Sequence, residues 1–75
     1  MSLLYQLTDR EQEILELIAT GQYNQEIATE LDISVFTVQS HIQSILRKVE
    51  AKNRVEAVSK LWQKRIEKVI SVENS

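Results

Sequence analysis

The apolar positions of residues 24–49 predict two helices joined by a tight turn. Three apolar residues of the first segment fall on one side of a short helix: Ile27, Ala28 and Leu31. Six in the second segment form one continuous apolar stripe: Val35, Val38, Ile42, Ile45, Leu46 and Val49. Between them lies the turn 32–34, and Ser34 is a suitable N-cap because its hydroxyl can accept from a free backbone N–H.

The opposite side of the second helix is rich in hydrogen-bonding groups and has no acidic residue. It carries Phe36, Gln39, Ser40, Gln43 and Arg47. Glutamine can hydrogen bond the edge of adenine in the major groove of DNA, so this face suits insertion there. Helix pairs of this kind also occur in bundles that bind no ligand, and the pattern alone leaves both interpretations open.

Capping residues place a further helix before this pair. Thr8 and Glu11 form a capping box, in which each side chain accepts from the backbone of the other residue, and predict a helix over about 9–20. Gly21 follows, where a left-handed residue commonly ends a helix. After a short connector, Asn24 is the expected cap of the next helix.

A last helix is expected to start near Arg54, with Asn53 as its cap. Its core-facing residues are Ala57, Val58 and Leu61, and its apolar stripe continues through Trp62, Ile66, Val69 and Ile70. A small core cannot cover that continuation, so it predicts a partner helix, most simply in a symmetric homodimer. The alternative is that the helix end folds back onto its own domain or frays. We also hypothesise that Arg54 pairs with Glu11 across the fold.

A longer series of residues runs in order through these segments. It comprises Leu7-Thr8-x-Arg10-Glu11-x-Glu13-Ile14-Leu15, Ile18-Ala19-x-Gly21, Asn24-x-Glu26-Ile27-Ala28-x-x-Leu31-x-Ile33-Ser34-x-x-Thr37-Val38-x-x-His41, Lys48 and Asn53-Arg54-x-Glu56-Ala57-Val58. This series resembles the LuxR-type (GerE-type) helix-turn-helix domain of bacterial transcription regulators. The resemblance implies a compact all-α domain of four helices, whose third helix lies in the major groove and whose fourth helix forms a homodimer.

The resemblance also suggests site residues. Base contacts are expected from Gln39, Ser40 and Gln43, with Phe36 as a further candidate. Phosphate contacts are expected from Asn24, Ser34, Thr37, His41, Arg47 and Lys48, and dimer contacts from Trp62, Ile66 and Val69. The chain departs from the family at the outward positions after Thr37-Val38, where lysine is frequent. Here these positions include Gln39 and Gln43, which carry no charge for a phosphate contact. Phe36 has two open interpretations: contact with a thymine methyl group, or packing against a neighbouring helix.

Length and composition favour one small intracellular domain. The expected organisation is an N-terminal extension (1–6), a helix-turn-helix domain (7–70) and a disordered tail (71–75). No run of residues is long and apolar enough for a membrane span, and no signal peptide is visible, so we expect a cytoplasmic protein. The family resemblance implies that it is bacterial. The formal net charge is −2, but residues 1–33 hold seven acidic and one basic residue, whereas residues 34–75 hold eight basic and four acidic ones. The expected DNA-contacting half is therefore the basic half.

The leading hypothesis is a sequence-specific, homodimeric regulator that binds double-stranded DNA, with no cofactor, metal or small-molecule ligand. A protein-interaction module that has lost DNA affinity is the alternative, because the chain is acidic overall. A third possibility is a promoter-recognising sigma-factor domain, but residues 54–58 and the last helix favour the LuxR type instead. One histidine, no cysteine and one glycine offer no nucleophile–base pair or phosphate-binding loop, which argues against an enzyme. Whether the chain is a complete regulator or the C-terminal domain of a larger one stays open.

Overall fold

The computed structural model describes the backbone of residues 6–73 and the side chains of residues 6–66. Four α-helices follow one another: α1 Asp9–Ala19, α2 Asn24–Leu31, α3 Val35–Lys48 and α4 Arg54–Glu73. No strand occurs in this described part of the chain. The all-α, four-helix prediction is confirmed, and α2, the turn and α3 form the expected helix-turn-helix.

Side-chain caps fix where three of the helices begin. The Thr8 hydroxyl accepts from the Glu11 N–H at 3.1 Å and the Glu11 carboxylate accepts from the Thr8 N–H at 2.8 Å, which confirms the capping box. The Ser34 hydroxyl accepts from the Thr37 N–H at 3.0 Å at the start of α3. Asn53 accepts from the Glu56 N–H at 2.9 Å and so caps α4, as expected.

The start of α2 differs from the expectation. Asn24 is the first helical residue rather than the cap, and Tyr23 occupies the capping position. The Glu26 carboxylate accepts from the Tyr23 N–H at 2.8 Å, so the third helical residue satisfies this backbone group from within the helix. The Asn24 side chain is therefore available to a residue far along the chain, as described below. At the other end of α2, Asp32 adopts a left-handed conformation (φ 56°) that permits the tight turn into α3.

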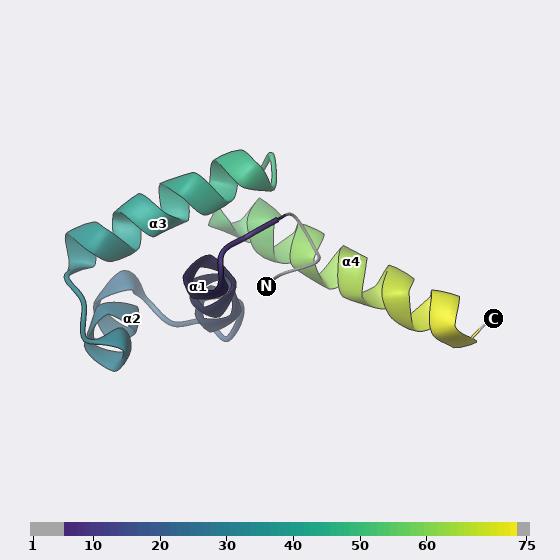
Figure 1. Cartoon of the computed structure of the whole chain (residues 1–75), viewed down its shortest axis with the longest axis horizontal. Coiled ribbons are helices and arrows are strands. Elements are labelled where there is room, and N and C mark those ends of the chain that lie inside the picture. Colours follow the sequence, from purple (N-terminus) through teal and green to yellow (C-terminus); the bar gives the residue numbers. More distant parts are fainter. Residues whose placement is uncertain (1–5, 74–75) are drawn as a thin grey trace.

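The core lies where α1 contacts the other three helices (Figure 1). It comprises Leu7, Ile14, Leu15, Ile18, Ile27, Ala28, Val38, Ile42, Ile45, Val49, Ala57 and Leu61. Ile33 in the turn packs against this core, as its apolar character predicts. Burial of one side of α3 leaves its other side facing solvent.

The last helix extends beyond the body of the domain. In Figure 1 the second half of α4 projects away from the other helices, and the molecule measures 43 × 22 × 21 Å. The helix continues to Glu73, so residues 71–73 are helical where a disordered tail was expected; no proline or glycine there ends the helix. Residues 1–5 and 74–75, which belong to the expected extension and tail, lie outside the described residues. Within the described part of the chain, no helix combines the length and the apolar character that crossing a bilayer requires.

Candidate nucleic-acid interface

Four exposed side chains form a stripe along the outer side of α3. They are Phe36, Gln39, Ser40 and Gln43, which we call the α3 stripe. Their spacing is that of one face of a helix, and the opposite face of α3 is buried in the core. The stripe therefore combines two amides, a hydroxyl and an aromatic ring, and it carries no formal charge.

Phe36 is 81% exposed, although it is a large apolar residue. The interpretation that its ring packs against a neighbouring helix is therefore wrong. Val35, the preceding residue, packs against the core instead, because it lies on the buried side of the first turn of α3. Phe36 is left pointing outward beside the polar residues of the stripe.

Two hydroxyl groups lie at the start of α3. The oxygens of Ser34 and Thr37 are 2.9 Å apart, and both residues are exposed. The Ser34 oxygen also accepts from the Thr37 N–H, so the first turn of the helix orients both groups. Hydroxyl donors at a helix N-terminus can bind a phosphate oxygen, whose negative charge the helix dipole also favours.

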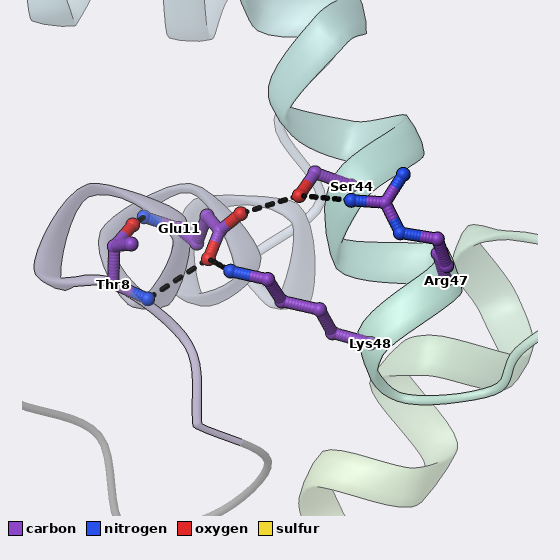
Figure 2. Close-up of polar contacts among 5 residues, drawn as sticks. All are labelled: Thr8, Glu11, Ser44, Arg47 and Lys48. Atoms are coloured by element: carbon purple, nitrogen blue, oxygen red, sulfur yellow. Dashed lines mark hydrogen bonds and ion pairs between the residues drawn. The ribbon is translucent and has the colours of Figure 1, made fainter.

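The C-terminal part of α3 carries the basic residues. Arg47 is exposed, and one of its guanidinium nitrogens lies 3.5 Å from the Ser44 hydroxyl, to which it donates. His41, in the middle of the helix, is half-buried. Figure 2 shows Arg47 beside a polar cluster that joins α3 to α1.

Lys48 belongs to that cluster. Its ammonium group donates to Oε1 of Glu11 at 2.7 Å, and the Ser44 hydroxyl donates to Oε2 at 2.7 Å (Figure 2). Glu11 is only 4% exposed, and burial alone would raise its pKa; hydrogen bonds from Lys48, Ser44 and the Thr8 N–H outweigh burial and lower the pKa to about 2. The carboxylate therefore stays charged and joins the start of α1 to the end of α3.

The hypothesised pair between Glu11 and Arg54 is wrong. Lys48 is the cation beside Glu11, and the Arg54 guanidinium donates to the side-chain oxygen of Asn24. This contact places a positive charge next to the first residue of α2, where the sequence predicted only an uncharged phosphate contact. Arg54 is thus a candidate that sequence reasoning missed, since residues 24 and 54 approach only in the folded chain.

Helix α4 exposes several large apolar residues. Trp62 and Ile66 are 49% and 56% exposed, while the side chain of Val69 lies outside the described residues. Val55, nearer the start of the helix, is 75% exposed and borders a shallow apolar pocket of about 230 Å³ that also involves Ile18, Arg54 and Val58. Sequence reasoning did not single out Val55, which precedes the expected core-facing residues Ala57, Val58 and Leu61.

Within the described residues, no group of three or more histidine, cysteine, aspartate or glutamate side chains could hold a metal ion. The site thus comprises a helix pair packed on the core, an exposed stripe on its second helix, hydroxyls at the start of that helix and basic residues at its end. Together they define a helix-turn-helix domain of the DNA-binding kind.

Comparison with known proteins identifies the family. Residues 5–61 match the family described as bacterial regulatory proteins, luxR family, and the chain belongs to that family. It is 52% identical over 58 residues to the transcriptional regulatory protein DesR of Bacillus subtilis, covering 77% of this chain and 29% of that protein. It is 49% identical over 61 residues to the nitrate/nitrite response regulator protein NarL of Escherichia coli, covering 81% of this chain and 28% of that protein.

A third relative is the response regulator protein VraR of Staphylococcus aureus, with 52% identity over 52 residues, which cover 69% of this chain and 25% of that protein. The chain thus spans less than a third of the length of these relatives. Membership of this family, together with the similarity to regulatory proteins, shows that this chain is a DNA-binding helix-turn-helix domain of the transcription-regulator type.

Proposed function

We propose that this chain is a sequence-specific DNA-binding domain that inserts α3 into the major groove. The observation that carries the proposal is the α3 stripe, which faces outward and is free of acidic residues in a chain whose family consists of regulatory proteins. An α-helix fits the major groove, where base edges present hydrogen-bonding groups and methyl groups. The protein would act in the bacterial cytoplasm, on the DNA of the nucleoid, and would need no cofactor.

Base and phosphate contacts come from different parts of the site. In this proposal Gln39, Ser40 and Gln43 contact base edges together with Phe36. Phosphates are contacted by Ser34 and Thr37 at the start of α3, by His41 and Arg47 further along it, and by Asn24 at the start of α2. Arg54 would add a charge near Asn24. Lys48 would use only those ammonium protons that it does not donate to Glu11.

The chain would bind DNA as a homodimer through α4. The exposed apolar residues Val55, Trp62 and Ile66 lie along that helix, and contact with a second copy would remove them from water. Two domains related by a two-fold axis would contact half-sites about one helical turn apart. Val69 is kept in this proposal as a dimer residue by its position on the same helix.

A protein-interaction module is the alternative function. It is favoured by the net charge of −2 and by the uncharged Gln39 and Gln43, because phosphate contacts supply much of the affinity of DNA-binding proteins. Such a module would keep the fold and bind a protein partner through the same outer face. DNA affinity and its dependence on salt separate the two functions.

Selection from a pool of random duplexes, followed by salt titration, tests the proposal. We expect enrichment of a two-fold-symmetric site, and an affinity that falls by about 0.9 log units per log unit of salt for each phosphate contacted. Absence of enrichment together with absence of binding at low salt would contradict the proposal and favour the protein-interaction module.

Replacement of Gln39 tests whether the stripe contacts bases. Gln39→Ala should weaken binding to the selected duplex by about 1–3 kcal/mol and binding to a random duplex much less, because only the specific complex uses the amide. Competition titrations with both duplexes measure the two losses. Gln63→Ala is the matched control, since it removes an exposed glutamine from α4. Equal losses on both duplexes would exclude Gln39 from base contact.

A further inference from the structure

We propose that Phe36 selects thymine in the target site by contact with its C5-methyl group. This inference rests on the proposed function and adds to it the identity of a base. The structure supplies three observations: the exposure of the ring, its position on α3, and the chemistry of its neighbours in the stripe.

The exposure of Phe36 is unusual for its residue type. At 81% exposed, its ring contributes almost nothing to the core, whereas a buried phenylalanine stabilises the folded state because its ring leaves water. The ring is therefore available to a partner, and contact with that partner would remove it from water in turn. An apolar surface on the partner suits the ring best, because contact between them removes both from water.

The position of Phe36 directs it toward base edges. It is the second residue of α3, and in helix-turn-helix proteins the N-terminal residues of the second helix contact the bases. Gln39, Ser40 and Gln43 follow it on the same face of the helix. The hydrogen bond from the Thr37 N–H to Ser34 caps the same turn and fixes the backbone from which the ring projects.

The major groove offers one kind of apolar group, the methyl group of thymine. The neighbouring amides favour adenine, which presents a donor and an acceptor that glutamine can bind together. Guanine is most often contacted by arginine or lysine, and the α3 stripe contains neither. The stripe as a whole therefore favours A·T pairs, with Phe36 on thymine and a glutamine on adenine.

Replacement of thymine by deoxyuridine removes only the methyl group and tests the inference directly. Each thymine of the selected duplex is replaced in turn, in both half-sites, and the dissociation constant is measured for the wild type. Loss of one buried methyl group corresponds to about fourfold weaker binding per half-site. We expect this loss at one symmetric pair of positions, and we expect Phe36→Ala to bind thymine and deoxyuridine duplexes equally well.

Tyr23→Ala is the matched control, because it removes another exposed aromatic residue that lies outside α3. This variant should keep the full difference in dissociation constant between the thymine and deoxyuridine duplexes, whatever its effect on total affinity. A wild type that binds its selected duplex equally well after every replacement by deoxyuridine would overturn the inference and leave the proposed function intact. A Phe36→Ala variant that still binds the thymine duplex more tightly than the deoxyuridine duplex would have the same consequence. A wild type that binds no DNA would overturn both.

Discussion

At the scale of single residues, Glu11 both caps its own helix and contacts the end of α3. One carboxylate oxygen accepts from the Thr8 N–H, which caps α1, and also from Lys48 at the end of α3. The other oxygen accepts from Ser44, which Arg47 in turn contacts. The orientation of α3, and with it the direction of the α3 stripe, is therefore tied to the start of α1.

The low pKa of Glu11 makes part of the stability depend on pH. The folded pKa of about 2 lies below the ordinary value of 4.5, so the ionised group stabilises the fold fully above about pH 4.5 and loses this effect as the pH falls toward 2. The shift corresponds to about 3 kcal/mol. Glu11→Gln should lower the free energy of unfolding by about 2–3 kcal/mol near neutral pH, because the neutral amide loses the charge-assisted hydrogen bonds from Lys48 and Ser44.

Urea denaturation of both proteins between about pH 6 and pH 2 measures this contribution. The difference between wild type and Glu11→Gln should shrink as Glu11 becomes protonated. Glu13→Gln is the control: its pair with Arg10 is solvent-exposed and should contribute less than about 1 kcal/mol. A difference that stays constant across the range would show that the charge of Glu11 does not stabilise the fold.

At the scale of helices, local sequence rules predicted most of the fold. The side chains of Thr8, Ser34 and Asn53 cap their helices as expected, and the apolar stripe of α3 is the buried one. These features depend on residues within one turn of each other, so the sequence displays them directly. The family resemblance added the roles of two helices, major-groove contact by α3 and homodimer formation by α4, and both roles stay predictions.

Contacts between distant residues could not be predicted in this way. The cation beside Glu11 is Lys48 and not Arg54, and Arg54 contacts Asn24 instead. The chain contains several basic residues, any of which could neutralise a buried carboxylate. Only the packing of the helices determines which of them lies beside Glu11. The roles of all the site residues toward DNA stay predictions, and the side chains of Lys48 and Asn24 already have a partner within the domain.

The proposed dimer surface on α4 can be tested by the substitution Trp62→Glu, which should prevent dimer formation. Trp62 is half-exposed, and the Arg65 guanidinium lies 5.6 Å from the centre of its ring. Arg65 also pairs with Glu16 of α1, so it joins the proposed dimer surface to the core domain. A buried carboxylate at position 62 would be costly in a dimer interface but would be solvated in a monomer.

Sedimentation equilibrium with the selected duplex measures the stoichiometry. Wild type should bind as two copies per duplex, whereas Trp62→Glu should bind as one copy and retain its helical circular dichroism. Gln63→Glu is the matched control, because it adds the same charge to an exposed neighbouring position and should still bind as two copies. Two copies of Trp62→Glu per duplex would contradict a dimer through α4.

At the scale of the whole molecule, charge is divided between the two halves of the chain. Residues 1–33, which include α1 and α2, are acidic, and residues 34–75, which include α3, are basic. The part of the sequence that contains α3 thus has an excess of basic residues although the net charge of the chain is −2.

DNA binding through α3 is tested most directly by titrating the ¹⁵N-labelled protein with duplex DNA and following its NMR spectrum. The backbone amide signals of the α3 stripe and of Ser34 and Thr37, with the side-chain amide signals of Gln39 and Gln43, should shift most. The backbone amide signals of the buried residues Ile14 and Leu61 should change little. A mixed-sequence duplex at low salt is sufficient, because phosphate contacts alone bring α3 to the DNA. Shifts confined to α1 or α4, or the absence of shifts at low salt, would contradict DNA binding through α3.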